Sequence, residues 1–528
     1  MKRRTFLQGI AATAAAAPIM LNGVPARAMT SLPLLAQMEA DAGDKILIII
    51  QLFGGNDGLN TVIPIGQDEY YKLRPVLGIA EKDADNVLGA GKVYLNRALS
   101  NGSRGGLTAM LGNGTAALIQ GIGYDKPNLS HFRSTDIWLS GINNSDPNVR
   151  LDTGWVGRYL EKRYPTFPLS LPDDPLAIQL GGFSLALMSS KGRMGIEVGD
   201  PSKQKGVSST LGTLDMDSVG THYEMEYAFV ADIAARSNKY AANVKAAYAA
   251  GSAKLQAQYA SDVLSQQMAS VAALIAGGLK TRVYVVSMGG FDTHVTQQTD
   301  ALNGPHPTLL GRLADSTAQF MFDMVRLGYA NNIIGMTVSE FGRRPAENGS
   351  FGTDHGASSV QFVFGTQVNS GVFGQTPDLT NLDENGDLPY QIDYRRVYTE
   401  ILGDWFGLTL PEARVILQDD SLTPIDVIKP QAGVAAPAQP VRVELIQMVN
   451  YPNPFSASTT VQINLEARST IRVDITNTAG QHIATLAEGM HEPGTYKFPF
   501  TQAEASGTYI CSVEAGGKHY TRMMQCTK

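Results

Sequence analysis

The stretch Ile46-Leu-Ile-Ile-Ile-Gln-Leu-Phe53 is a nearly unbroken run of bulky apolar side chains, and Gly54-Gly-Asn-Asp-Gly58 follows it directly. An apolar run of this length, bounded by turn residues, is typical of a β-strand that is buried on both faces. Two later runs, Arg282–Met288 and Ile333–Val338, have the same form. These three segments predict the central strands of a sheet that is covered on both sides.

Acidic and imidazole side chains gather beside these runs. Arg282–Met288 leads into Gly-Gly-Phe-Asp-Thr-His (289–294), Ile333–Val338 leads into Ser-Glu-Phe-Gly-Arg (339–343), and Gly-Thr-Asp-His-Gly (352–356) stands just ahead of the strand-like Val360–Gly365. In an open, mostly parallel sheet the carboxyl ends of the strands form the ligand crevice, so we expect these groups to converge. Carboxylates and imidazoles are the ligands that Zn, Mn, Ca and Mg require. The pattern therefore predicts a metal centre.

Residues 29–425 alternate apolar strands with helical segments. The helix-period stretch Pro307–Gly328 lies between the runs that end at Met288 and Val338, and the order strand, helix, strand predicts a parallel βαβ unit. Thr115–Ile122 predicts another strand, which leads to a helix start at Asn128–Ser130. We expect an α/β domain with a mostly parallel sheet flanked by helices.

The order of these motifs resembles the DUF1501 branch of the alkaline phosphatase and sulfatase superfamily, a branch of secreted bacterial proteins. The resemblance covers about Asp44 to Leu410. It rests chiefly on Gly-Gly-Asn-Asp-Gly-Leu-Asn-Thr (54–61), Asn-Leu-Ser-His-Phe (128–132), Gly-Gly-Phe-Asp-Thr-His (289–294), Ser-Glu-Phe-Gly-Arg (339–343) and Asp-His-Gly (354–356). The resemblance implies an alkaline-phosphatase-like sheet that binds one or two divalent metal ions. Zn is the expected metal, with Ca, Mg or Mn as alternatives.

Matched position by position, the resemblance implies a set of metal ligands in this chain. These are Asp57, Asp292, His294, Glu340, Asp354 and His355. Asp57 also fits an ordinary turn or helix N-cap, the common use of Asp beside Gly and Asn. His294 lies closer to Asp292 in sequence than the superfamily pattern has it, so His294 could be a solvated surface residue, with His306 as the second ligand.

Phe341 is the chief departure from the superfamily pattern. Hydrolytic relatives carry Asp-His after this strand, whereas Glu340-Phe341 offers only one ligand. His355 matches a later Gly-x-His motif that supplies a ligand to the other metal. Asp354 is then a replacement ligand or a partner that orients His355.

The resemblance implies a nucleophile at Ser130, just after the strand Thr115–Ile122. A helix N-terminus there would favour a phosphate or sulfate oxygen. Simple N-capping explains Ser130 equally well, and Asn128, His131 or Ser134 could take the functional part. Arg343 is a candidate catalytic clamp on the anion, because a guanidinium meets phosphate in a planar fork, with an ordinary surface arginine as the alternative.

Residues 1–28 have the form of an export signal with a twin-arginine start: Lys2-Arg3-Arg4, then an Ala-rich apolar stretch, then Ala26-Arg27-Ala28. This apolar stretch is too short to predict a transmembrane span. The formal net charge of the whole chain is −7, and the predicted signal contains four basic residues and no acidic one. The mature chain is therefore more acidic still, which argues against nucleic acid as a partner.

A Pro/Ala-rich linker is predicted over 426–443, followed by short alternating strands with turn signals over 444–528. This last segment predicts a small β-sandwich. It resembles the C-terminal sorting domain of the type IX secretion system, with a generic fibronectin-like binding module as the alternative. Cys511 and Cys526 lie in it, and sequence alone does not establish whether they pair.

These features together predict an exported metal-dependent hydrolase-like protein that acts on a phosphate or sulfate ester. Its expected partners are that anionic ester and the export and type IX secretion machinery. Its expected route leads through the periplasm to the cell surface or the medium. Two rivals are a non-catalytic cell-surface binding or structural protein on the same scaffold, favoured by Phe341, and a carrier exported with a tightly held ion.

Overall fold

The computed structural model divides the chain into two compact units, Met1–Gln431 and Ala432–Lys528. It describes residues 19–21, 24–26, 45–87, 93–168, 171–181, 184–204, 238–429, 446–451, 453, 455–465, 469–477, 481–492, 494–501, 506–515 and 518–527. Most of the predicted signal peptide and of the predicted linker lies outside these residues. Within the signal, β1 (Ile19–Leu21) pairs with β2 (Val24–Ala26).

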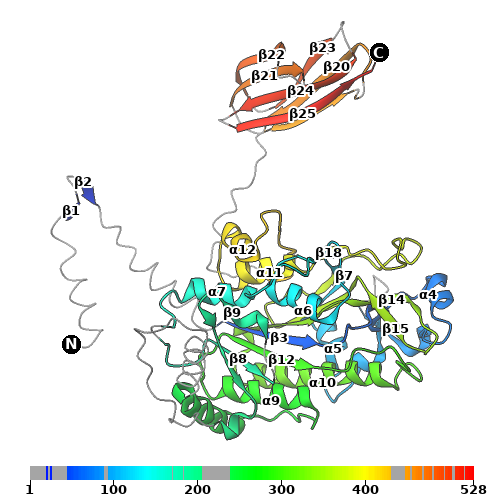
Figure 1. Ribbon diagram of the computed structural model, residues 1–528, viewed down its shortest axis with the longest axis vertical. Helices are drawn as coiled ribbons and strands as arrows, with labels where there is room; N and C mark the ends of the chain where they lie inside the picture. The colour runs from blue at the N-terminus through cyan, green and yellow to red at the C-terminus, as the bar shows by residue number, and fades with distance from the viewer. Residues whose placement is uncertain are drawn as a thin grey trace. The chain divides into compact units, whose positions relative to one another are not determined.

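A nine-stranded sheet forms the centre of the first unit (Figure 1). Eight strands follow one another across the sheet, and β18 (Ile392–Asp393) pairs with β7 beside them. The order is β11 (Ile196–Val198), β8 (Ala177–Leu180), β12 (Val283–Met288), β3 (Ile46–Leu52), β13 (Ile333–Ser339), β16 (Ser359–Phe364), β7 (Ala116–Gly123) and β17 (Gly371–Phe373). Neighbouring strands are parallel except where β16 pairs antiparallel with both β13 and β7. The predicted mostly parallel α/β sheet is confirmed.

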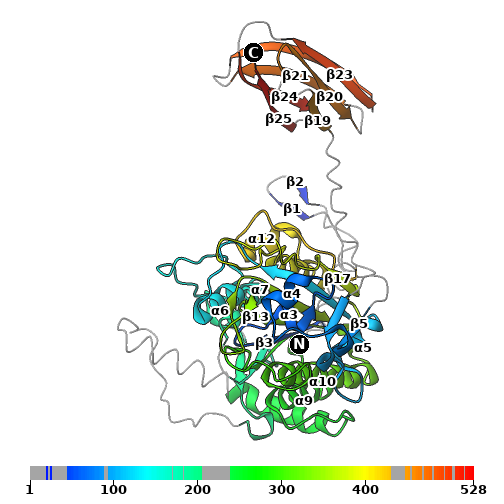
Figure 2. The same cartoon turned by 90° about the vertical axis from the view of Figure 1, so that its right-hand side faces the viewer.

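Alternate residues of β3 point into two separate cores, because successive side chains of a strand face opposite sides of the sheet. Ile48 and Ile50 pack with α5 (Gly106–Gly112), α9 (Val263–Ala276) and α10 (Pro305–Arg326). Leu47 and Ile49 pack into the second core, together with α6 (His131–Ser140), α7 (Trp155–Arg163), α11 (Arg395–Glu400) and α12 (Leu410–Leu417). Figures 1 and 2 show these two helical layers on opposite faces of the sheet.

Smaller elements complete the first unit. At the carboxyl edge of the sheet lie α3 (Gly58–Thr61), α4 (Asp68–Leu73) and the hairpin of β14 (Gly342–Glu347) and β15 (Thr353–Gly356). A small sheet joins β4 (Val62–Ile63), β6 (Val93–Asn96) and β5 (Ala84–Val87), and β9 (Met188–Ser189) pairs with β10 (Gly192–Arg193). A helix over 238–252 precedes α9. Among the described helices, none is both long and apolar enough to cross a bilayer.

The end of the first unit packs further along the chain than predicted. Glu400 is buried, and its carboxylate accepts the backbone N–H groups of Ile425 and Ile428. Lys429 N–H donates to the carbonyl of Gln367. These bonds attach the chain through Lys429 to the first unit, a few residues beyond the predicted end at 425.

Seven antiparallel strands make up the second unit as two sheets around a common core. One sheet contains β19 (Ile446–Tyr451), β20 (Ser458–Leu465) and β23 (Gly494–Thr501). The other contains β22 (His482–His491), β21 (Ser469–Asn477), β24 (Gly507–Ala515) and β25 (Lys518–Cys526). Phe455, Val473 and Phe500 are buried in the core, which confirms the predicted β-sandwich.

Cys511 and Cys526 are both buried free thiols in this sandwich. In the register of β24 and β25, Cys511 stands opposite Arg522, and Cys526 stands opposite Gly507. Four residues of strand therefore separate the two positions, roughly 14 Å. A disulfide needs Cα atoms within about 7 Å, so the pair cannot close in this fold.

We expect both thiols to be protected in the folded protein. Burial raises the pKa of Cys511 to about 12, so almost none of it is thiolate at pH 8. An aromatic disulfide reagent added without reductant should label neither cysteine in buffer and both in denaturant. Two unreactive cysteines in denaturant would mean that a disulfide forms after all.

Candidate metal centre

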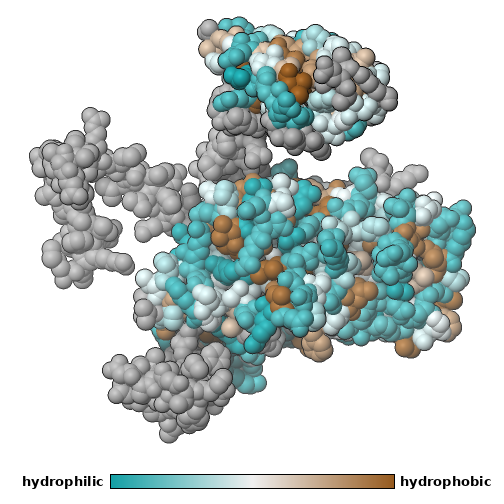
Figure 3. Space-filling view, turned by 45° about the horizontal axis from the view of Figure 1, so that its top comes forward, coloured by the Kyte–Doolittle hydropathy of each residue, from teal (hydrophilic) through white to brown (hydrophobic). Residues whose placement is uncertain are grey.

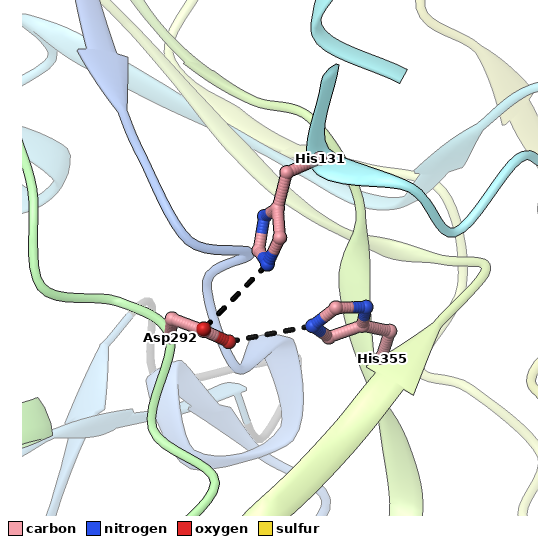
Figure 4. Close-up of side chains that lie close together, drawn as sticks. All are labelled: His131, Asp292 and His355. Carbon is pink, nitrogen blue, oxygen red and sulfur yellow. Dashed lines mark hydrogen bonds and ion pairs between the residues drawn. The ribbon is translucent and has the colours of Figure 1, made fainter. Parts of the chain in front are cut away.

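Four segments of the first unit meet at the carboxyl edge of the sheet. Asp292 follows β12, Glu340 follows β13, and His131 begins α6 after β7. His355 lies on β15, just ahead of the antiparallel strand β16, so the reversed direction of β16 brings its preceding segment to the same edge. Figure 4 shows His131, Asp292 and His355 facing one another. The convergence predicted from the motif order is therefore present.

Asp292 stands between two histidines. Nε2 of His131 lies 3.6 Å from Oδ2 of Asp292, and Nε2 of His355 lies 3.3 Å from Oδ1. One ligand atom from each of the three residues falls within 4.8 Å of the other two. Two imidazoles and a carboxylate can supply three of the four ligands of a tetrahedral ion and leave the fourth position open.

The hydrogen bonds of His355 fix which ring nitrogen carries its proton. Nδ1 lies 2.8 Å from the carbonyl oxygen of Leu129, and a carbonyl only accepts. Nδ1–H is therefore the donor, and Nε2 of the neutral ring keeps its lone pair towards Asp292. Burial, together with Arg343, lowers the pKa of His355 and favours this neutral form, against the opposing effect of Asp292 and the carbonyl.

His131 is held in the same tautomer by another acceptor. Its Nδ1 lies 2.9 Å from Oε1 of Glu340, which also accepts the backbone N–H of Gly54 at 2.8 Å. Since an ionised carboxylate only accepts, Nδ1 carries the proton and Nε2 is left for a ligand. The other oxygen of Glu340, Oε2, is buried without a hydrogen-bond partner. Glu340, a predicted ligand, instead holds the ring of His131 in place.

Asp292 remains ionised because Arg343 forms an ion pair with it. Nη2 of Arg343 donates to Oδ1 at 2.6 Å. Partial burial raises the pKa of Asp292, but Arg343 and the adjacent histidines outweigh this effect and bring the pKa down to about 2. The carboxylate of Asp292 lies within hydrogen-bond distance of Nε2 of His355, at 3.3 Å, and near Nε2 of His131, at 3.6 Å. The donor set fits a divalent cation, which would satisfy all three at once.

Arg343 itself is buried, and its donors are used within the protein. Nε donates to the carbonyl oxygen of Gly55 at 3.0 Å, and Nη1 donates to the carbonyl oxygen of Thr353 at 2.6 Å. Nη2 donates to the carbonyl oxygen of Phe291 at 3.1 Å and also to the carbonyl oxygen of Gly54. The predicted clamp on a substrate anion does not fit this arrangement. Arg343 is a positioning residue that ties three loops to Asp292.

His294 also touches Asp292 but does not complete the three-residue cluster. Its Nδ1 lies 2.8 Å from Oδ1 of Asp292, and Nη1 of Arg343 lies 3.3 Å from the same nitrogen. The alternative ligand His306 is buried elsewhere, with Nε2 3.1 Å from Oδ1 of Asn56, and burial lowers its pKa to about 4. His294 therefore lies next to the centre, and His306 does not join it.

Asp57 is not brought into the cluster. It is fully buried, and Arg74 donates to both of its oxygens, to Oδ2 at 2.6 Å and to Oδ1 at 3.0 Å. Gln297 donates to Oδ2 at 2.5 Å, and Oδ1 caps α3 through the N–H of Leu59 at 3.2 Å. Burial alone would raise the pKa of Asp57, but Arg74 keeps it below its ordinary value. The predicted ligand thus serves as a buried ion-pair partner and N-cap.

Two other predicted residues are exposed and are not members of the three-residue cluster. Asp354 is exposed and accepts a hydrogen bond from Asn348 at 3.0 Å, since neighbouring residues of β15 face opposite ways. Ser130 is exposed at the N-cap of α6, yet its side chain makes no cap bond, which leaves the N-capping alternative without support.

Phe341 packs against the rings of both histidines. Its ring centre lies 4.9 Å from that of His131 and 4.3 Å from that of His355. Gly55 is required opposite it, because a Cβ there would lie 2.5 Å from the Phe341 ring. Phe341 thus sets the position of the imidazoles instead of binding an ion.

His131 is the site residue that sequence reasoning placed outside its ligand set. It stands in the motif 128–132, beside the serine to which the nucleophile role was assigned. A histidine at the start of a helix after a central strand was the available signal. A cavity of about 110 Å³, lined in part by Ile46, Leu279 and Asn332, lies at the opposite edge of the sheet and is not part of this centre.

Two family models match the chain. Residues 191–418 match DUF1501, described as a protein of unknown function, and residues 449–525 match a secretion system C-terminal sorting domain. The sorting domain implies export to the cell surface or the extracellular space by the type IX machinery. A search of curated proteins finds no match.

Several solved structures are similar to this chain at low identity. One, from work on glycosaminoglycan metabolism by Bacteroides thetaiotaomicron, is 11% identical over 84% of this chain and 89% of its own, with a TM-score of 0.32. A Pseudoalteromonas sp. sulfatase is 10% identical over 89% and 86%, with a score of 0.31. A Vibrio parahaemolyticus protein of the alkaline phosphatase superfamily is 9% identical over 100% and 91%, with a score of 0.32. No residue role follows from scores this low.

Asp57→Asn should destabilise the fold, because it leaves the buried charge of Arg74 unpaired. We expect the free energy of unfolding at pH 7 to fall by about 3–5 kcal/mol, measured by urea denaturation. The carboxylate's pKa is lowered in the folded protein, so its contribution is present above pH ~4 and is lost as the pH drops through the folded value. The difference between wild type and variant should therefore shrink in acid. Equal stabilities at pH 7 would contradict the ion-pair role.

Proposed function

We propose that this exported protein, whose residues 191–418 match DUF1501 and whose residues 449–525 match a secretion sorting domain, is a metal-dependent ester hydrolase. Its centre holds one divalent ion, Zn²⁺ in preference to Mn²⁺, Mg²⁺ or Ca²⁺. His131, Asp292 and His355 are its ligands. The substrate is a phosphate or sulfate ester.

One observation carries this proposal. Nε2 of His131 and Nε2 of His355 both face the carboxylate of Asp292, and the Nδ1 protons of both rings are already committed to Glu340 and to the carbonyl of Leu129. A cation placed between them would bind both ring nitrogens and the carboxylate at once. Ring nitrogens suit Zn²⁺, whereas Ca²⁺ and Mg²⁺ prefer all-oxygen sites.

A single ion is favoured because Asp57, one of the predicted ligands, is already neutralised. Both oxygens of Asp57 bind the guanidinium of Arg74 in a buried pair. Removing either partner of such a pair is strongly unfavourable, so Asp57 is not free to change partners. The Phe341 ring packs against both histidines and offers no ligand atom there.

When bound, the ion would polarise the ester and lower the pKa of the attacking hydroxyl or water. Glu340 and Leu129 hold the two imidazoles in the tautomer that leaves Nε2 open, and Arg343 orients Asp292. Ser130 directly precedes His131, and its exposed hydroxyl makes no cap bond. We assign to Ser130 the attack on phosphorus or sulfur: the new bond to Oγ replaces the bond to the ester oxygen, and the departing alcohol takes up a proton equivalent to the one the hydroxyl loses. Water then cleaves the serine ester to release phosphate or sulfate, and the helix dipole of α6 would favour the oxyanion.

A non-catalytic binding protein on the same scaffold is the second candidate. The hydrogen bonds of the described residues give the Ser130 hydroxyl no general base, and a nucleophile of this kind usually has one. The same metal centre would then serve to bind an anion without turnover.

Elemental analysis of protein purified with its own export signal should find about one Zn²⁺ per chain. His131→Ala, Asp292→Asn and His355→Ala should each lose the ion. Glu340→Gln should keep it with roughly 10–100-fold weaker affinity, because the carboxylate holds a ligand from behind. Competition with a chelating dye measures each affinity.

Asp354→Asn is the matched control, since this exposed carboxylate adjoins His355 but lies outside the cluster. Its metal content should equal that of the wild type. Two ions per chain, or loss of the ion in Asp354→Asn with His131→Ala unaffected, would show that the ligand set is wrong.

Ester hydrolysis separates the enzyme from the binding protein. The Zn²⁺-loaded protein should turn over at least one member of a panel of phosphate and sulfate monoesters and diesters. Ser130→Ala should retain the metal and lower kcat by at least about 100-fold if Ser130 is the nucleophile. A protein that holds stoichiometric metal yet hydrolyses no ester would support the binding function.

A further inference from the structure

Large apolar side chains are exposed on the segments that build the metal centre. Phe132 is 87% exposed and follows His131, and Val295 is 65% exposed and follows His294. Exposed apolar residues that are scattered singly need no explanation, but a group of them around a charged centre does.

Two more lie on neighbouring loops. Phe53 is 40% exposed and ends the run that leads to Gly54, and Phe351 is 53% exposed and precedes Gly352. On the face shown in Figure 3, apolar patches interrupt a mainly hydrophilic surface. We refer to Phe53, Phe132, Val295 and Phe351 as the apolar collar.

Backbone contacts connect three members of the collar to the loop that carries Asp292. The N–H of Phe291 donates to the carbonyl of Phe53 at 3.1 Å, one residue before Asp292. On the other side of that loop, the N–H of Gln297 donates to the carbonyl of Phe351 at 2.8 Å. A Cβ on Gly352 would lie 2.2 Å from the carbonyl carbon of His294, so the chain beside Phe351 packs directly against the chain beside Val295.

The backbone is strained where these two chains meet. Phe351 has φ of 58° and Thr296 has φ of 46°, values that side chains larger than glycine rarely adopt. The N–H of Thr296 donates to the carbonyl of Ser350 at 3.0 Å, which holds both residues in this conformation. Strain of this kind persists where the surrounding structure enforces it and clusters at ligand sites. Here it holds an exposed phenylalanine beside the centre.

We propose that the apolar collar binds the hydrocarbon part of an amphiphilic ester whose anionic head reaches the metal ion. This rests on the proposed function and names its substrate class: a phosphate or sulfate ester with an aliphatic or aromatic group beside the ester bond. The head is attracted by the cation, and the hydrocarbon part removes the exposed collar from water. Inorganic phosphate or a methyl ester would make only the contact between the anionic head and the metal ion.

Binding of n-alkylphosphonates, from methyl to octyl, tests this in the Zn²⁺-loaded full-length protein without requiring turnover. The head group stays constant along the series, so only the buried hydrocarbon changes. Isothermal calorimetry should show the Kd falling by up to about fourfold for each added methylene. Phe132→Ala and Phe351→Ala should flatten this dependence and leave the Kd of methylphosphonate unchanged.

Val415→Ala is the matched control, because Val415 is 73% exposed on α12 and lies outside the collar. It should keep the full dependence on chain length. If the Kd of the wild type does not depend on chain length, the apolar collar does not bind the hydrocarbon part, and the proposed metal centre is unaffected by this result. No binding of any phosphonate would overturn both. An oligomer that Phe132→Ala converts to a monomer, with the chain-length dependence unchanged, would assign the collar to contact with a second copy.

Discussion

The fork of hydrogen bonds from Arg343 is the constraint on which the carboxyl edge of the sheet depends. Its guanidinium joins the loop after β3 at Gly54, the loop after β12 at Phe291 and the strand β15 at Thr353, and it holds the carboxylate of Asp292 as well. A planar guanidinium satisfies several acceptors in fixed directions, which a lysine ammonium on a flexible stem cannot do. The position of Asp292 is therefore set by backbone carbonyls from three distant segments.

Charge at this edge is distributed among carboxylates with different partners. Arg74 neutralises Asp57 in the interior, and Arg343 grips Asp292 at the surface, where one face of the carboxylate stays open. Glu340 is buried, and no described lysine or arginine pairs with it. Glu340 instead accepts a hydrogen bond from Nδ1 of His131. A cation bound at Nε2 of the same ring would lower the free-energy cost of burying the carboxylate of Glu340.

Much of this arrangement follows from the sequence. Apolar runs ending in glycine and acidic residues predicted the strands β3, β12 and β13, whose shared direction placed Asp292 at this edge. His355 lies at the same edge because β16 runs the opposite way. The fate of Asp57 could not be predicted, because Arg74 lies in a segment with no motif and meets it only through tertiary packing. Which ring nitrogen of a histidine carries the proton likewise depends on acceptors distant in sequence. The ligand roles themselves stay predictions.

The reversed direction of β16 has a consequence for how this edge could change in evolution. Parallel strands need a long crossover, whereas β13 and β14 lead out to one hairpin turn and β15 and β16 lead back, all within residues 333–364. Glu340 and His355 thus both lie on the single short ribbon formed by β13 to β16. Such a ribbon can be lengthened, trimmed or exchanged between homologues without disturbing the order of the strands beneath it, so chemistry at this rim can diversify while the scaffold is inherited intact.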